Sequence, residues 1–265
     1  MKSVILIPAR YQSTRYPGKP LAEIRGANGA AKSLIQRSVE AARRVAGVSE
    51  VFVTTDDDRI ADACSALSVG VIMTSPECRN GTERCAEALK SLHAPDLVIN
   101  FQGDALLTPP GFVEALIGRM DQDQDALVAT PAMRLRSSEA RALQDEEAVG
   151  RVGGTSVVTD DQGHALYFSK RLIPHLPKGA LEGAMSPVRL HVGVYAYRPE
   201  ALDRYVSAPM SELEMLEGLE QLRFLAAGIK IAVVDVATPP FALRELNNPE
   251  DMEAIEQALV DAGLE

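Results

Sequence analysis

The chain has 265 residues, of which 46% are hydrophobic and 24% charged, a composition that excludes intrinsic disorder as its main state. Its 27 basic and 37 acidic residues give a net charge of −10, so we expect no nucleic acid partner. The apolar runs are shorter than the ~20 residues of a membrane span and the three cysteines form no CxxC pair, so we expect a cytoplasmic protein without membrane contact, disulfide framework or cysteine zinc site.

The first half of the chain alternates short β-rich apolar runs with helical patterns. The predicted strands cover residues 4–8, 50–54, 69–73 and 96–101, and the predicted helices cover residues 32–46, 59–67, 82–92 and 110–120. The strand runs are nearly continuous in Val, Ile and Leu, which is typical of parallel strands covered by helices on both faces. This order predicts a doubly wound α/β fold with a mainly parallel sheet.

A different pattern begins near residue 150. Residues 155–159 and 164–169 flank a polar turn and are predicted to form a β-hairpin, and residues 190–197 a further strand. The intervening residues 173–187, with three prolines and two glycines, are predicted to form a loop. A helix over 211–226, a strand over 229–236 and a helix after Asn248-Pro249 follow. We predict a single domain over residues 1–265, with 150–210 as an antiparallel part.

Basic residues are concentrated at the N-terminus, although the whole chain is acidic. Residues 1–25 contain five basic residues and one acid, and Arg10, Arg15 and Lys19 follow the first predicted strand. The carboxyl ends of such strands are where open α/β sheets bind ligands, so these cations suggest a small polyanion such as a triphosphate. Neither GxGxxG nor GxxxxGK[ST] is present. From the three cations alone, a solvated basic loop remains the alternative.

The order of residues in this loop resembles a known family. IPARYQSTRYPGKPL at residues 7–21, NGTER at 80–84 and NFQGD at 100–104 resemble the CMP-sugar-acid synthetases, particularly the branch that uses 3-deoxy-manno-octulosonate (Kdo). ALYFSK at 165–170, RLHVGVYAYR at 189–198, LEQLRFL at 219–225 and NNPEDM at 247–252 follow in the family's order, so the likeness spans nearly the whole chain.

The resemblance implies a Rossmann-like nucleotidyltransferase fold and a cytidylyltransferase reaction. The anomeric hydroxyl of a 2-keto-3-deoxy sugar acid, Kdo or a close analogue, would attack the α-phosphorus of CTP and release pyrophosphate. Such chemistry depends mainly on positioning and charge neutralisation, so the missing nucleophile motif does not weigh against it. The resemblance also implies Mg²⁺ as cofactor and a homodimer formed through the antiparallel part, for which the apolar strand at residues 192–197 gives indirect support.

The same resemblance assigns roles to individual positions. It gives catalytic roles to Arg10, Lys19 and Asp104, and CTP contacts to Pro8, Ala9, Arg10, Arg15, Lys19, Asn80, Gly81, Arg84 and Gln102. It gives sugar-acid contacts to Lys170, Arg171, Arg189, His191, Tyr195, Glu220 and Gln221, and magnesium ligation to Asp104 and Asn247.

Structural explanations compete with several of these roles. His191 and Tyr195 are four residues apart on a strand pattern, which also fits a half-buried polar face. Glu214, Glu217 and Glu220 share one helical pattern with Gln221, which also fits a solvated stripe.

Three departures from the family pattern concern the predicted site. Ala105 and Leu106 stand where an acidic residue and a proline are usual, Lys170 replaces an arginine, and Asn247 replaces the second aspartate ligand. An amide keeps an oxygen for magnesium but removes one negative charge, for which Glu245 is a candidate replacement. Residues 248–251 also have a purely structural explanation, since Asn248 before Pro249 is a good helix start.

These departures leave two other functions open. One is a nucleotidyltransferase for a different anionic acceptor, such as another nonulosonate, an amino-sugar acid or a phosphonate-bearing metabolite. The other is a noncatalytic CTP-binding relative, favoured by Asn247 and Ala105. It is opposed by four intact residues of the family pattern: Arg10, Lys19, Gln102 and Asp104. A purely structural protein would leave the cationic N-terminal loop unexplained.

Overall fold

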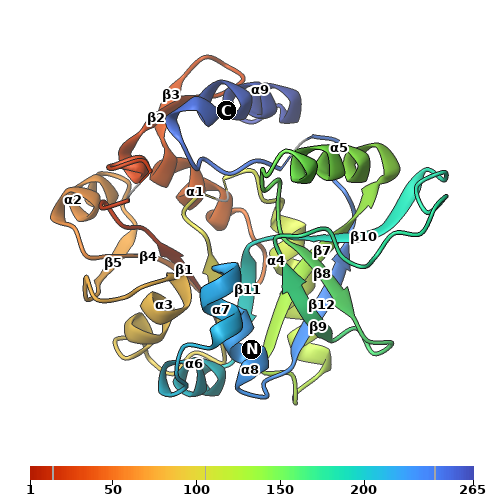
Figure 1. The fold of residues 1–265 in the computed structure, drawn as a ribbon. Helices are drawn as coiled ribbons and strands as arrows, with labels where there is room; N and C mark the ends of the chain where they lie inside the picture. The colour runs from red at the N-terminus through yellow and green to blue at the C-terminus, as the bar shows by residue number, and fades with distance from the viewer. Residues whose placement is uncertain (14, 105, 242) are drawn as a thin grey trace.

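The fold is a mixed sheet with helices on both faces (Figure 1), seen in a computed structural model that describes residues 1–13, 15–104, 106–241 and 243–265. The parallel half has the strand order β5 (Gly70–Met73), β4 (Glu50–Thr55), β1 (Ser3–Pro8) and β6 (Leu97–Phe101). These are the four strands predicted from the Val, Ile and Leu runs. The doubly wound fold is therefore confirmed.

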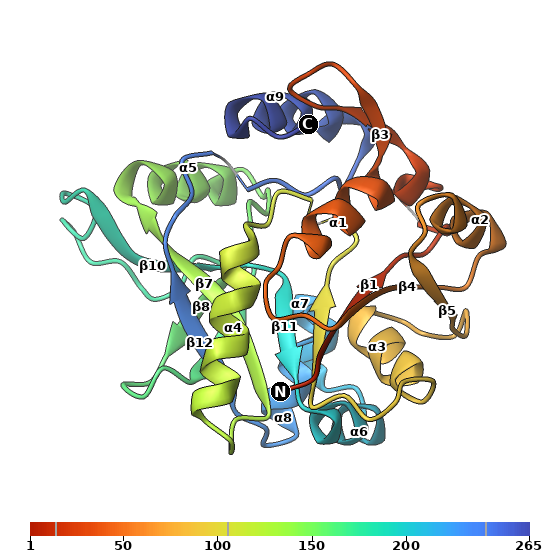
Figure 2. The same cartoon turned by 180° about the vertical axis from the view of Figure 1, so that it is seen from behind.

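Alternate side chains of the central strands face opposite helical layers. Ile5 and Ile7 of β1 pack in the core with α1 (Leu34–Arg43), α2 (Asp58–Ala66) and α4 (Pro110–Gln122). The view from behind shows α1 and α4 in front of the sheet (Figure 2). Val4 and Leu6 pack on the other face, in the core with α3 (Gly81–Leu89), α6 (Pro199–Ser207) and α8 (Leu222–Ala226). Continuous hydrophobicity along β1 thus reflects burial on both faces.

The second half of the chain extends the same sheet. β11 (Val194–Tyr197) lies antiparallel between β6 and β7 (Val128–Arg136), and β12 (Ile231–Val236) runs parallel to β7. β10 (Met185–His191) pairs with the end of β7, and β8 (Ser156–Thr159) and β9 (Ala165–Ser169) follow as the antiparallel hairpin predicted from the sequence.

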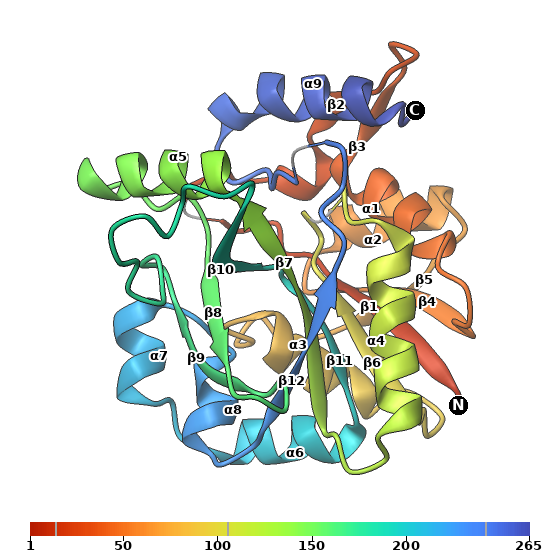
Figure 3. The same ribbon diagram turned by 90° about the vertical axis from the view of Figure 1, so that its right-hand side faces the viewer.

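Helices and a small hairpin lie at the end of the sheet where β7 and β12 terminate. Figure 3 shows α5 (Ser137–Ala148) and α9 (Met252–Ala262) at this end. The 3₁₀ turn η1 (Lys19–Leu21) and the hairpin of β2 (Glu23–Arg25) and β3 (Ala31–Ser33) belong to the N-terminal segment, and η2 (Pro249–Asp251) leads into α9. No helix of the described residues is both long and apolar enough to cross a membrane.

Two predicted elements are divided in the structure. The single strand predicted over 190–197 is two strands, β10 and β11, which change partner around Val192 and Gly193. The helix predicted over 211–226 is α7 (Glu212–Glu217) followed by α8, because Gly218 has φ of +61° and ends the first helix in the left-handed conformation. The prediction of one continuous helix was therefore wrong.

The apolar strand expected to support a dimer has another role. β11 is an internal strand, paired on both sides and fully buried, so its hydrophobicity is explained by the core of one chain. This sequence observation therefore gives no support to a homodimer.

Candidate active site

A cavity of about 860 Å³ lies at the carboxyl end of the sheet. Its wall comes from the loop after β6, the junction of β10 and β11, the break between α7 and α8, and the segment before η2. Eight predicted site residues line it: Arg15, Gln102, Asp104, Lys170, His191, Tyr195, Gln221 and Asn247. The structure thus brings residues from six separate motifs to one place.

The loop after β1 is held against the loop after β6. The Ala9 amide donates to the Thr54 carbonyl at 2.9 Å, which continues the pairing of β1 with β4 past Pro8. A methyl group at Gly103 would lie 2.6 Å from the Pro8 carbonyl oxygen, so only glycine permits this approach. The QGD motif is therefore packed directly on the end of β1, where Arg10 is exposed.

Two cations of the N-terminal loop contact the two predicted metal ligands. The Lys19 ammonium lies 2.6 Å from Asp104 Oδ2, and both side chains are about four-fifths buried, with 19% and 20% of their surface exposed. The Arg15 guanidinium donates to Asn247 Oδ1 at 3.1 Å. Ala105, one of the departures from the family pattern, lies outside the described residues, and Leu106 is buried in the core with Ile24 and Leu246.

Glu245 is a further acidic group of the same wall. Its carboxylate is exposed to the cavity but surrounded by protein, and this desolvation, with repulsion from Asp104, raises the pKa of Glu245 to about 7. The Asn247 side chain and the Lys19 and Arg15 cations oppose the shift. Asp104 and Glu245 therefore both line this wall, together with Arg15 and with Lys19 paired to Asp104.

This donor set fits a hard divalent cation. Asp104, Glu245 and Asn247 offer only oxygen ligands, and the Lys19 ammonium on Asp104 shows that a cation is accommodated there. Within the described ranges no cluster of three or more His, Cys, Asp or Glu residues suits a metal ion. A cation at this place would therefore depend on the amide and on further oxygens, such as those of a phosphate or water.

The NGTER segment begins α3, and its polar side chains have partners within the protein. Asn80 Oδ1 accepts from the Glu83 amide at 2.8 Å as the helix cap, while its Nδ2 donates to Tyr205 Oη at 3.0 Å. The Arg84 side chain is buried, donates to Thr74 and lies 3.5 Å from Asp56. Neither side chain lines the cavity, so direct nucleotide contact by the Arg84 guanidinium finds no support in its position.

Gly81 starts α3 at a point of close packing. A methyl group there would lie 3.2 Å from Asn100 Nδ2 and 3.4 Å from Gln102 Nε2. Both amide atoms of the fully buried Asn100 lack a hydrogen-bond partner among the described residues. The space next to Gln102 is thus polar and narrow.

His191 and Tyr195 lie together on the cavity wall, with ring centroids 5.3 Å apart. Burial lowers the pKa of His191 to about 3, so its imidazole is neutral near pH 7. The Thr130 hydroxyl donates to the Val194 carbonyl at 2.8 Å and contacts His191 Nε2 at 2.9 Å. Since the hydroxyl has one proton, Nε2 must be the donor, which leaves Nδ1 as an acceptor.

Glu220 is not part of the cavity wall but orients one of its residues. Its carboxylate accepts from Gln102 Nε2 at 3.2 Å and from the Thr82 amide at 3.1 Å. Burial raises the pKa of Glu220, and these hydrogen bonds counter only part of the effect. The neighbouring Gln221 is buried and lines the cavity. The alternative of a solvated stripe is therefore wrong for both residues.

Three cations predicted for the sugar acid occupy different surroundings. Lys170 lines the cavity, and its backbone amide donates to Glu217 Oε2 at 3.0 Å. Arg189 instead forms a two-point ion pair with Asp235 of β12, at 2.7 and 3.0 Å. Arg171 pairs with Glu147 at 3.0 Å in a small adjoining pocket, which shares Lys170 with the cavity. Of the three, only Lys170 lines the cavity, so the predicted contacts of Arg171 and Arg189 find no support in their positions.

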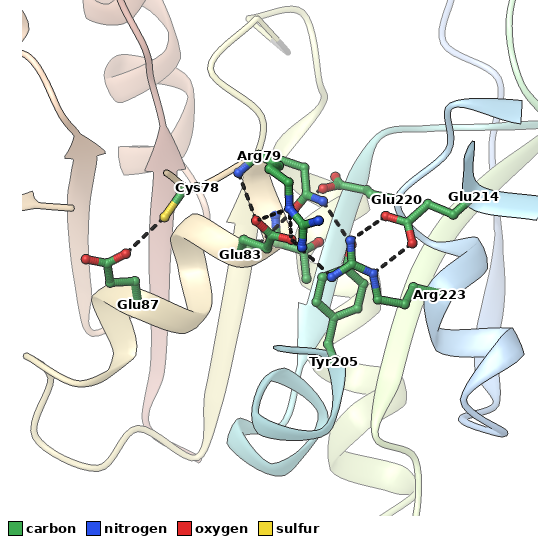
Figure 4. A network of polar contacts seen from close by, with 10 residues as sticks. Cys78, Arg79, Glu83, Glu87, Tyr205, Glu214, Glu220 and Arg223 are labelled. Atoms are coloured by element: carbon green, nitrogen blue, oxygen red, sulfur yellow. Dashed lines mark hydrogen bonds and ion pairs between the residues drawn. The ribbon is translucent and has the colours of Figure 1, made fainter. Parts of the chain in front are cut away.

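A buried ion network fixes the helices behind this wall (Figure 4). The Arg223 side chain, 1% exposed, contacts both oxygens of Glu214 at 2.5 and 2.7 Å and Glu83 at 3.0 Å. Its guanidinium lies 4.2 Å from the centroid of the Tyr205 ring. Because Glu83 belongs to α3 and Arg223 to α8, the network ties the NGTER segment to the helix after Glu220 and Gln221.

Sequence reasoning missed several residues of this site. Thr130 comes from β7, which was not predicted, and its contact with His191 joins positions 61 apart. Glu146 and Arg244 also line the cavity and belong to none of the motifs found in the sequence. Glu245, in contrast, was named from the sequence as a candidate replacement for the charge that Asn247 lacks.

The chain is similar to known proteins in sequence and in fold. The family model described as cytidylyltransferase matches residues 4–231. The chain belongs to this family. It is 40% identical over 264 residues to 3-deoxy-manno-octulosonate cytidylyltransferase of Maricaulis maris, covering 99% of both chains, and 41% identical over 267 residues to that of Tolumonas auensis, covering 98% of this chain and 97% of the other.

A solved structure supports the same relationship. CMP:2-keto-3-deoxy-manno-octonic acid synthetase in complex with CTP matches with a TM-score of 0.84 and 37% identity, over 99% of this chain and all of the other. The predicted membership of the CMP-sugar-acid synthetases and the nucleotidyltransferase fold are therefore confirmed.

Proposed function

We propose that the chain transfers CMP from CTP to the anomeric hydroxyl of Kdo and releases pyrophosphate. The observation that carries this proposal is the pairing of Lys19 with Asp104 and of Arg15 with Asn247 at one end of a large cavity. These residues come from the motifs shared with the family, and the relatives that carry this activity are about 40% identical over nearly the full chain.

CTP would lie across the carboxyl ends of β1 and β6, with its triphosphate over the N-terminal loop. Arg10, Arg15 and Lys19 would hold the phosphates, and Pro8 and Ala9 would contact the nucleoside. Lys19 and Arg10 would stabilise the negative charge that grows on the departing pyrophosphate, a form of catalysis that needs no covalent intermediate. Gln102, held by Glu220, would contact the nucleoside or the acceptor at their junction.

Asp104 and Asn247 would hold the magnesium ion in this proposal. When bound, the ion would neutralise negative charge on the phosphates. Lys19 and Arg15 must then leave these two side chains, and the phosphates are the natural new partners for both cations.

The sugar acid would occupy the part of the cavity between Lys170 and His191. The Lys170 ammonium offers a charge for the substrate carboxylate, and neutral His191 offers Nδ1 as an acceptor for a sugar hydroxyl. Tyr195 and Gln221 complete this side of the wall. The same proposal includes a homodimer, magnesium dependence, and a role in lipopolysaccharide or capsule assembly. It also includes action in the cytoplasm, where CTP is made.

The test is pyrophosphate release from each of the four nucleoside triphosphates with magnesium, with and without Kdo, followed by mass analysis. Formation of CMP-Kdo from CTP supports the proposal. Release that requires a different acid acceptor would overturn the choice of Kdo. CTP binding with no acceptor-dependent release, across an acceptor panel, would overturn the enzymatic function in favour of a noncatalytic relative.

A further inference from the structure

We propose that Glu245 supplies the second negative charge at the magnesium site, in place of the acidic side chain that Asn247 lacks. This rests on the proposed function, because it concerns the ion that accompanies CTP. It assigns to Glu245 a role that none of the motifs above contains.

The backbone directs Glu245 and Asn247 towards the same space. Leu246, between them, is fully buried in the core with Ile24 and Ile255, while the residues on either side line the cavity. Leu246 is therefore anchored in the core, while its two neighbours remain on the cavity side. The amide and the carboxylate therefore act from one stretch of chain.

Glu245 also reaches the QGD loop that carries Asp104. A methyl group at Gly193 would lie 3.6 Å from Glu245 Oε1 and 3.7 Å from Gln102 Cγ, so the Glu245 carboxylate and the Gln102 side chain approach the same point. Asp104 is two residues further along and lines the same cavity. Two carboxylates in one cavity repel each other, and a divalent cation between them would turn this repulsion into attraction.

The other cavity carboxylates are less suited to this role. Asp251 Oδ2 accepts from the amides of Asn247 and Asn248 at 3.0 and 2.7 Å, so it caps the turn before α9. Glu146 belongs to α5, and its carboxylate lies beside Gly153, where a methyl group would meet Oε2 at 2.4 Å. Among the cavity carboxylates of the described residues, Glu245 is thus the one that lines the cavity together with Asn247 from the same stretch of chain and caps no helix or turn.

The experiment measures Mn²⁺ binding to the full chain with saturating CTP and no acceptor, by electron paramagnetic resonance of the unbound ion. Glu245→Gln keeps the shape and removes the charge, and we expect it to weaken Mn²⁺ binding by about 10–100-fold. Asn247→Asp added to Glu245→Gln should restore most of the affinity. Glu146→Gln, which removes the same charge from the same cavity, is the matched control and should change the affinity by less than about twofold.

Two outcomes would overturn the inference: unchanged Mn²⁺ affinity in a folded Glu245→Gln variant that still binds CTP, or equal losses in the Glu245 and Glu146 variants. Failure of the proposed function is recognised separately, since it would appear as absence of CMP-Kdo in the wild-type assay. If the wild-type chain with CTP binds no Mn²⁺, the inference fails whatever the assay of the wild-type chain gives.

Discussion

Replacing Lys19 by methionine tests whether its ion pair with Asp104 serves catalysis or stability. The substitution keeps the length and much of the apolar stem but removes the charge. Since about a fifth of each partner remains exposed, the loss in stability should lie between that of a surface pair and that of a buried one, about 1–2 kcal/mol. For a chain of this size that corresponds to a melting temperature lower by roughly 2–8 °C.

The effect of this substitution on the reaction should be much larger. A cation that stabilises charge on the leaving pyrophosphate contributes mainly in the transition state, so kcat should fall about 100–1,000-fold while KM for CTP changes less. Lys19→Arg keeps the charge and should retain more activity. The assay is steady-state pyrophosphate release, with thermal unfolding measured on the same samples. A folded Lys19→Met variant with kcat within about threefold of the wild type would refute the catalytic role.

Three further expectations follow from the buried groups. Arg223→Met leaves the buried Glu214 carboxylate without its cation and should lower the free energy of unfolding by about 3–5 kcal/mol, measured by urea unfolding. A decrease below about 1 kcal/mol would contradict a stabilising role for this buried ion pair. Hydrogen bonds from Arg79 and Arg223 hold the pKa of Glu83 below its usual value, against the effect of burial. The stability that Glu83 contributes is therefore present above about pH 4.5 and lost as the pH falls through its folded pKa. Acid unfolding should show that the stability of the Arg223→Met variant depends less on pH in this range. In ¹⁵N spectra, His191 should remain neutral down to pH 5, with its proton on Nε2. A proton on Nδ1, or an unchanged tautomer in the Thr130→Val variant, would show that Thr130 does not set the tautomer of His191.

The parallel half of the fold was predictable because its signals are local. Val4 to Ile7 and Leu97 to Phe101 are apolar runs of strand length, and Ser33, Asp57 and Asn80 are polar caps in front of helical patterns. β7 was missed because Pro131 lies inside it and arginines alternate at its end, a sequence that resembles no ordinary buried strand. Its pairing with β11, β10 and β12 compensates, and those contacts are not visible locally.

The site was predictable where the motif residues lie in the loops that follow the parallel strands. Asp104 comes shortly after the end of β6, and the loop after β1 brings Lys19 within 2.6 Å of it. Arg84 and Arg189 have the right charge for an anion, but their partners Asp56 and Asp235 are supplied by other strands or loops. Residue type alone cannot tell a ligand-binding arginine from one already paired in the fold.

In the proposed function, the arrangement of charges would make CTP and metal binding depend on one another. Lys19 contacts Asp104 and Arg15 contacts Asn247, so a metal ion that binds these oxygens as proposed would displace both cations towards the triphosphate. Each ligand should therefore strengthen the other by the same factor, as linkage requires. In Lys19→Met no ammonium competes for Asp104, so Mn²⁺ should bind more tightly than in the wild type without CTP, and CTP should enhance it less. Weaker Mn²⁺ binding by this variant in the absence of CTP would show that Lys19 does not compete with the metal for Asp104.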